Sequence, residues 1–197
     1  MKNSFKVLLT TALLFTATLS TYAQFENNRE TCRFHMGLRA GVSSNTYTGD
    51  ALGAIDPLVY FTGGLAFDIQ VAPVPVFVGW GLNYLNEGVK NYRGVDYNAS
   101  AIHIPLVVGY HFNLSPNFFI SPYVGGFSSY CVEDLDNKGW DNERFNYGLR
   151  FGVGLNFGRL TFDAAYDLGL KNIGNSMNKR HTSTLFFTLG VNLVGKR

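Results

Sequence analysis

The clearest structural signal in the sequence is a stretch of ten residues: Thr184-Leu185-Phe186-Phe187-Thr188-Leu189-Gly190-Val191-Asn192-Leu193. Its odd-numbered residues are all Leu, Phe or Val, whereas its even-numbered residues are Thr, Phe, Gly or Asn. Successive side chains of a β-strand point to opposite faces, so this period of two predicts a strand with one apolar face and one mixed face. We expect the two faces to meet different surroundings.

The same alternation recurs through most of the chain. Six further segments have one parity that is apolar and another that is small, polar or charged: 35–43, 61–70, 76–87, 102–113, 145–156 and 160–171. An eighth segment, Phe118 to Cys131, mixes both kinds of residue on both parities, and its faces cannot be assigned from the pattern. The sequence therefore predicts eight strands and few or no helices.

The connections between these segments alternate in length. Short connections rich in Pro, Asn, Ser or Gly lie at 72–75, 113–117 and 157–159, and long ones at about 45–60, 88–98, 132–144 and 172–181. A meander with every short turn at one end and every long loop at the other is typical of a transmembrane β-barrel. We therefore predict an all-β, eight-stranded antiparallel up-and-down barrel whose apolar parity faces lipid.

The composition agrees with a lipid-facing wall. The chain has 197 residues, of which 46% are hydrophobic and 15% are charged, whereas soluble domains carry about 25% charged residues. The net charge of +2 is no footprint of a nucleic-acid-binding protein. Five aromatic residues near the ends of the segments are expected to form interfacial girdles: Tyr84, Tyr110, Phe112, Phe118 and Tyr147.

The first residues have the pattern of an export signal. Lys2 and Lys6 precede an apolar run from Val7 to Leu19, and Thr21-Tyr22-Ala23 ends with small residues. We predict a cleaved signal peptide at 1–23, a periplasmic segment at 24–33 and an outer-membrane barrel domain at 34–197. Removing Lys2 and Lys6 leaves 14 basic and 14 acidic residues.

The polar parity of the strands is expected to fill the lumen. It carries a nearly balanced set of charged and histidine side chains that we predict to form a structural network: Arg39, Asp68, Glu87, His103, His111, Arg150, Asp163, Asp167 and Lys171. Charges in so narrow an interior must pair with one another or meet trapped water. The sequence thus predicts a lumen plugged by side chains, without an open pore.

Pro105 lies in the middle of an expected strand. A proline there removes a ladder hydrogen bond, and a closed barrel has no edge strand on which to place it. We therefore predict a β-bulge at Pro105.

The same region carries a family resemblance. Ile102-His103-Ile104-Pro105-Leu106, followed by Gly109-Tyr110-His111-Phe112, resembles a strand of the PorT-like outer-membrane β-barrel family. Gly37 to Gly41 and Tyr166 to Ile173 resemble its opening and penultimate strands. The resemblance implies an eight-stranded barrel of a Gram-negative outer membrane, and the family's namesake takes part in protein secretion across that membrane.

The cysteines, histidines and acidic segments of the sequence fit no defined chemical site. Cys32 and Cys131 would lie at opposite ends of the barrel, too far apart for a disulfide. The four histidines lack metal-ligand spacing, and the acidic segment Asp134 to Gly139 departs from a calcium loop at Lys138. We expect no catalytic site, no metal and no cofactor.

Three functions remain open from the sequence. The first is a structural or interaction role through the long extracellular loops, by a monomeric barrel that contacts outer-membrane lipid and an envelope partner and is inserted by the barrel-assembly machinery. The second, implied by the resemblance alone, is an accessory of a protein-secretion system. The third is an outer-membrane enzyme that uses Asp163, Asp167 or His103.

Overall fold

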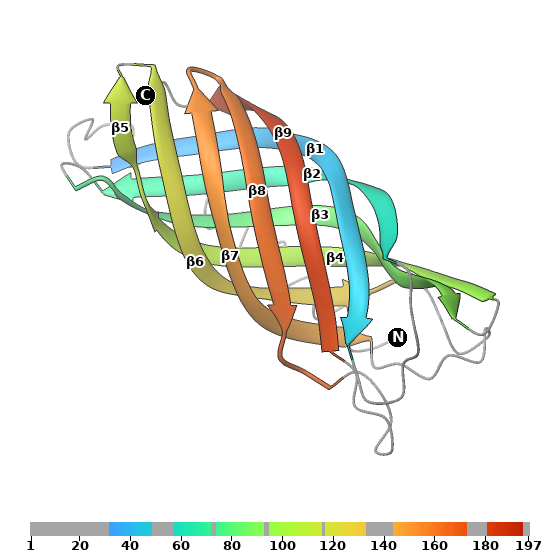
Figure 1. Ribbon diagram of the computed structural model, residues 1–197. Helices are drawn as coiled ribbons and strands as arrows, with labels where there is room; N and C mark the ends of the chain where they lie inside the picture. Colours follow the sequence, from blue (N-terminus) through green and yellow to red (C-terminus); the bar gives the residue numbers. More distant parts are fainter. Residues whose placement is uncertain are drawn as a thin grey trace.

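The computed structural model describes residues 32–48, 57–71, 74–92, 95–115, 117–132, 144–172 and 181–194. Its regular elements are nine strands (Figure 1): β1 (Cys32–Thr48), β2 (Leu58–Val71), β3 (Val76–Tyr92), β4 (Val95–Tyr110), β5 (Phe112–Ser115), β6 (Phe118–Cys131), β7 (Phe145–Phe157), β8 (Leu160–Gly169) and β9 (His181–Val194). Within the described ranges, no helix is long and apolar enough to cross a membrane.

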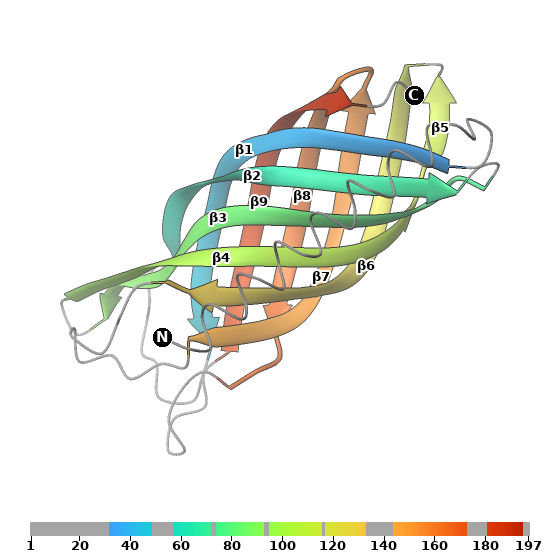
Figure 2. The same ribbon diagram turned by 180° about the vertical axis from the view of Figure 1, so that it is seen from behind.

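The strands form one closed antiparallel sheet. The order is β4-β3-β2-β1-β9-β8-β7-β6-β5, and a further β4–β6 pairing joins the two sides. Strand β5 continues β4 after an interruption at His111, so the two count as one strand of the barrel. The predicted eight-stranded up-and-down barrel is confirmed (Figures 1 and 2).

The stagger of the barrel follows from the strand register. A line of paired residues runs once around the sheet through Asn45, Thr184, Asp167, Arg150, Gly125, Val107, Gly79, Asp68 and His35. It leaves β1 at Asn45 and returns to β1 at His35, a shift of 10 residues. Closing an eight-stranded sheet requires such a stagger, with strands tilted by roughly 35–45° to the axis.

Short turns and long connections lie at opposite ends, as predicted. The strand ends that the β2–β3, β5–β6 and β7–β8 links join gather at the upper left of Figure 1, and the strand ends that the longer β1–β2, β6–β7 and β8–β9 connections join lie at the lower right. We call these the turn end and the loop end. The β7–β8 link is two residues long and begins with Gly158, whose φ of +58° favours glycine.

One predicted loop is a strand pair. The segment 88–98 was expected to be irregular, but β3 and β4 continue through it as a two-stranded ribbon, with Gly88 opposite Asn98 and Tyr92 opposite Val95. Figure 2 shows this ribbon extending beyond the other strands at the loop end. Its residues lack the clear alternation of the barrel wall, which is the reason the sequence pattern did not reveal it.

The two faces of the sheet divide as the alternation predicted. Apolar side chains such as Phe61, Leu106 and Leu189 are exposed by 60–67% on the outer wall, whereas the other parity lies inside. Strand β6, unassigned from sequence, turns Phe119, Tyr123 and Phe127 inward, together with Ser121, Ser129 and Cys131. The expected girdle residues Tyr84, Tyr110, Phe112 and Tyr147 are exposed on the outer wall, and Phe118 is half-buried there against Phe157.

The bulge predicted at Pro105 is absent from the described strands. Leu106 pairs with Trp80 and His103 pairs with Asn83 in one constant register, and the pairing with β6 is also continuous through Pro105. Only the β3 partners of Ile104 and Pro105 are missing from the ladder, as expected for a residue without an N–H donor. Gly81 lies opposite the proline ring and gives it room, so no inserted residue is needed.

The two cysteines lie on strands that run in the same direction, from the turn end to the loop end. Cys32 starts β1 at the turn end, opposite Val71, and Cys131 ends β6 toward the loop end, opposite Ala101. Cys131 is a buried thiol. This placement agrees with the expectation that the two residues form no disulfide.

A matched pair of substitutions tests the lipid-facing assignment. Phe151 and Phe157 both point outward from β7, Phe151 from mid-strand and Phe157 from the turn end. Arginine on the lipid face destabilises a barrel by about 2–4 kcal/mol at the bilayer midplane and by about 0–1 kcal/mol near an interface. We expect Phe151→Arg to lower the free energy of unfolding far more than Phe157→Arg, measured by urea titration in lipid vesicles. Equal losses would contradict the assignment.

Candidate functional site

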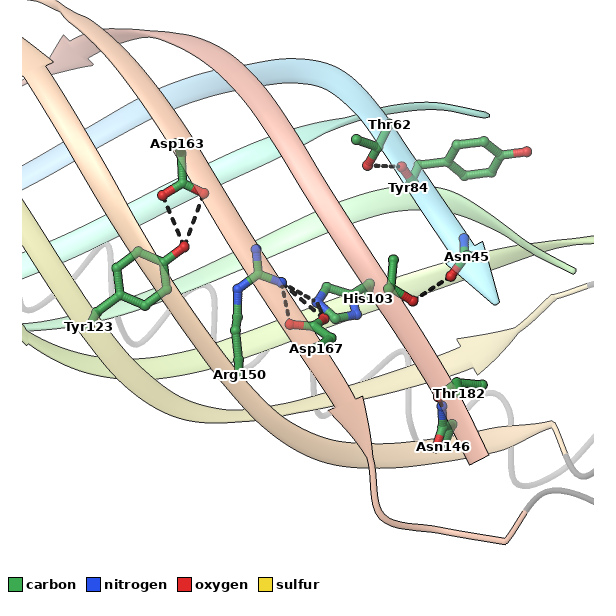
Figure 3. Close-up of polar contacts among 11 residues, drawn as sticks. Asn45, Thr62, Tyr84, His103, Tyr123, Asn146, Arg150, Asp163, Asp167 and Thr182 are labelled. Atoms are coloured by element: carbon green, nitrogen blue, oxygen red, sulfur yellow. Dashed lines mark hydrogen bonds and ion pairs between the residues drawn. The ribbon is translucent and has the colours of Figure 1, made fainter. Parts of the chain in front are cut away.

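The centre of the lumen holds an arginine, a carboxylate and a histidine in direct contact. Arg150 Nη1 on β7 donates to both carboxylate oxygens of Asp167 on β8 at 3.0 Å. His103 Nε2 on β4 lies 3.1 Å from that nitrogen and 3.2 Å from Asp167 Oδ2. Figure 3 shows the three side chains meeting inside the barrel. We call Arg150, Asp167 and His103 the central triad.

Aromatic rings enclose the central triad. The Arg150 guanidinium lies 4.7 Å from the centre of the Phe186 ring, and the His103 ring packs between Phe127 and Phe186. The side chains of His103 and Asp167 are both 2% exposed. Toward the loop end, Leu85, Ala99, Ala101, Cys131, Ala165 and Phe186 form one apolar cluster. The lumen is therefore filled at this level by a paired charge group and its apolar packing.

A second polar contact crosses a whole strand. Tyr123 Oη on β6 donates to the Asp163 carboxylate on β8, at 3.0 Å from Oδ1 and 2.9 Å from Oδ2 (Figure 3). The tyrosine reaches over β7 at Gly152, where a Cβ atom would overlap its ring and hydroxyl. The missing side chain of Gly152 thus makes this contact possible.

A chain of hydrogen bonds runs across six of the eight barrel strands nearer the turn end. His111 Nδ1 lies 2.7 Å from Ser121 Oγ, which accepts from Asn156 Nδ2 at 3.2 Å. The chain continues from Thr161 Oγ1 to Asn156 Oδ1 at 2.9 Å, from Asn192 Nδ2 to Thr161 Oγ1 at 3.5 Å, and from Arg39 Nη1 to Asn192 Oδ1 at 3.3 Å. These six residues, on the β4–β5 strand, β6, β7, β8, β9 and β1, form what we call the polar ring.

The remaining predicted site residues have separate positions. Asp68 Oδ1 on β2 lies 2.8 Å from Nδ1 of His35, its direct pairing neighbour on β1. Lys171 departs from the predicted lumenal network because β8 ends at Gly169, and its ammonium lies 5.4 Å from the centre of the Phe145 ring, a side chain on the outer wall. Glu87 belongs to β3, but its side chain lies outside the described part of the structure.

Sequence reasoning missed several members of these groups. Tyr123 was hidden by the mixed pattern of its strand, and His35 was on the inward parity but not included in the network. Asn45 and Thr184, whose side chains hydrogen bond to each other, are direct partners between β1 and β9. Their inward parity is the one signal that could have indicated them.

The space between the central triad and the turn end is a cavity of about 120 Å³ with a mixed lining. Polar side chains such as Arg39, Asp68 and Asp163 alternate there with apolar ones such as Phe77, Val107 and Phe186. A cavity of this volume and polarity can hold several water molecules that bond to the lining groups. Arg150 and Phe186, which belong to the packed group around the central triad, form part of this lining.

The geometry gives little scope for catalysis by the central triad. Ser129 on β6 is the direct pairing neighbour of His103 on β4, and Asp167 on β8 contacts the same imidazole across the lumen. Ser129, His103 and Asp167 are, however, exposed by only 1–2%, and a reactive group must be reached by its substrate. Among the described residues, no three His, Cys, Asp or Glu side chains are grouped to hold a metal ion.

Substitution of the ion pair tests whether it holds the lumen together. Removing one partner of a buried salt bridge leaves an uncompensated charge and destabilises a protein by about 3–5 kcal/mol. We expect Arg150→Met and Asp167→Leu each to lower the free energy of unfolding by about this amount, and the double variant to lose less than the sum. Urea titration in lipid vesicles measures all three, and additive losses would argue against a coupled pair.

A glycine pair tests the Tyr123 contact. Gly152→Ala places a methyl group against the rigid Tyr123 ring, and such overpacking costs about 1–3 kcal/mol. Gly154→Ala on the same strand meets its nearest atoms at 3.5–3.7 Å, an ordinary contact distance, and serves as the matched control. We expect Gly152→Ala to lower the unfolding midpoint in urea clearly and Gly154→Ala to change it little. Equal effects of the two alanines would contradict the geometry.

Comparisons with known proteins place this barrel in a family. The family model described as outer membrane protein beta-barrel domain matches residues 22–175. Among solved structures, the attachment invasion locus protein Ail of Yersinia pestis is similar at 13% identity and a TM-score of 0.46, covering 83% of this chain and 99% of Ail. A search of curated proteins finds no match.

Two other barrels are similar at the same level. Neisserial surface protein A has 14% identity and a TM-score of 0.42, with coverage of 80% of this chain and 95% of that one. The N-terminal β-barrel domain of Pseudomonas aeruginosa OprF has 11% identity and a TM-score of 0.39, with coverage of 80% and 97%. The family match spans most of the sequence, and the chain belongs to the outer membrane protein β-barrel domain family.

Proposed function

We propose that this protein is a non-enzymatic, monomeric outer-membrane barrel that acts through its loop end. The observation that carries the proposal is the filled lumen. The central triad is buried against Phe186 and Phe127, and this burial supports a lumen without a solute path or a substrate-accessible catalytic group at that level. We therefore expect other molecules to bind at the surfaces at the two ends of the barrel.

The longer connections of the chain join strands at the loop end. The β3–β4 ribbon extends beyond the barrel there. Three long connections, spanning 49–57, 132–144 and 170–180, join the other strands at this end. Long segments held by a rigid scaffold are common carriers of binding function. We propose that a protein or other envelope component binds these segments, after export by a cleaved signal peptide and insertion by the barrel-assembly machinery. A place in a secretion system rests on the PorT-like resemblance alone.

Loop replacement combined with crosslinking tests this proposal. Segments 133–143 and 173–180 would each be replaced by a short Gly-Ser linker, and the β3–β4 ribbon would be shortened at its tip. We expect each variant to keep the heat-modifiable gel mobility of a folded barrel and at least one to lose the crosslinked partner formed in intact cells. Capture of secretion components would support the secretion role.

The control for this experiment lies in the lumen. Thr188→Ser changes an inward, half-buried residue far from the loops and should leave the crosslink unchanged. Retention of every crosslink in all loop variants would overturn the proposed loop-end function, as would stepwise ion conductance of the unmodified protein in a planar bilayer.

A further inference from the structure

The turn end of the barrel contains a second hollow. Of the residues that line it, His111 alone also lines the lumenal cavity. The hollow has a volume of about 340 Å³, within the range of sites that hold small ligands. It is lined by Arg33, Gln70, His111, Asn113, Leu114, Ser115 and Phe119. These residues come from the first residues of β1, the end of β2, the β4–β5 junction and the start of β6, which meet where the short turns gather (Figure 1).

The lining is rich in hydrogen-bond donors and carries positive charge. Arg33 supplies a guanidinium, Gln70 and Asn113 supply amide groups, Ser115 supplies a hydroxyl, and His111 supplies an imidazole. None of the residues that line the hollow is Asp or Glu. The carboxylate of Asp68 lines the lumenal cavity instead and is bonded to His35.

The floor of the hollow is held rigidly. His111 is 4% exposed, its ring stacks on Phe77 with centroids 4.3 Å apart, and it meets the edge of Phe119 at 5.2 Å. Ser121 fixes its Nδ1 atom at 2.7 Å. Gln70 is 9% exposed and donates to the Val74 carbonyl at 3.5 Å. The side chains of His111 and Gln70 are therefore both more than nine-tenths buried and held in place by their neighbours.

The upper wall of the hollow is shaped by an irregularity in β5. Asn113 pairs with Phe119 and Ser115 pairs with Phe118, so Leu114 is an extra residue on the β5 side. A β-bulge of this kind bends its strand and redirects the neighbouring side chains. Asn113 and Ser115 are both exposed and both line the hollow.

The described turns beside the hollow add one cation and no carboxylate. Residues 69–71, 74–80, 107–115, 117–121 and 156–160 include Arg159 and no Asp or Glu, and Asp68, one residue before the first range, is paired with His35. Arg159 lies in the β7–β8 turn, outside the hollow. A negatively charged group approaching this end therefore meets attraction from Arg33 and Arg159 without a facing carboxylate from these turns.

We propose that this hollow binds a phosphate-type anion, with Arg33 pairing to the charge and the side chains of Gln70, Asn113 and Ser115 donating hydrogen bonds to its oxygens. Arginine forms a two-pronged contact with such groups, and donors preplaced around it add to the affinity. Two sources share this chemistry: the headgroup of a phospholipid with net negative charge in the leaflet at the turn end, or a soluble phosphate in the compartment that this end faces. This site is independent of the loop-end function.

Nuclear magnetic resonance of the full barrel tests the proposal and separates the sources. The isotope-labelled protein, purified folded from membranes, would be placed in nanodiscs of phosphatidylcholine and titrated with inorganic phosphate at constant ionic strength. In a second arm, phosphatidylglycerol would replace a fifth of the lipid. We expect saturable shifts of the Arg33, Asn113 and Ser115 amide signals in at least one arm, and about tenfold weaker binding for Arg33→Gln, the loss typical of a charge-assisted hydrogen bond.

Matched variants make the outcome decisive. Arg159→Gln removes the other described cation of this end without touching the hollow and should leave the affinity within about twofold, whereas Arg33→Lys should keep part of it. Shifts with inorganic phosphate would identify a soluble anion, and shifts only with phosphatidylglycerol would identify a lipid headgroup. Absence of saturable shifts in both arms, or equal losses for Arg33→Gln and Arg159→Gln, would overturn the proposal.

Discussion

The need to pair every backbone N–H and C=O group governs this structure. No water is available inside a bilayer to bond an open sheet edge, so a spanning sheet must close on itself. The closure here joins β4 to β6 and sets a stagger of 10 residues around eight strands. Eight strands leave an interior just wide enough for side chains. The inward residues must therefore be small, or must bond to one another.

The lumenal contacts are direct consequences of that register. Arg150 and Asp167, Asn45 and Thr184, and His35 and Asp68 are each nearest neighbours across adjacent strands, and all six residues lie on the single line that follows the stagger around the sheet. Opposite groups placed this way satisfy each other without distorting the strands. Of the glycines on the same line, Gly125 allows the backbone of Leu106 and Val107 to approach closely, and Gly79 leaves room for the side chains of Val107 and Phe77.

Because side chains fill the centre of the lumen, the polar groups that other molecules can contact lie at the two ends of the barrel. These two ends differ in their loops and in their charge. The loop end carries the long connections and the β3–β4 ribbon, and the turn end carries short turns, a donor-lined hollow and cationic side chains. His111 connects the interior to the turn end, because it belongs to the polar ring and also forms the floor of the hollow. One residue thus takes part in both the internal packing and the surface of that end.

The sequence by itself determined the barrel, its number of strands and, for seven of the eight strands, which side chains face lipid and which face the lumen. The reason is that a wall between lipid and a polar lumen imposes a period of two on each strand separately. Only the tertiary structure decided which lumenal groups meet. It brought Tyr123 to Asp163 over Gly152, left Lys171 outside the lumen and accommodated Pro105 without a bulge. Parity along a strand gives the face of a side chain, but its partners depend on the stagger and on missing side chains of neighbouring strands. Those are properties of the closed sheet, which no single segment contains.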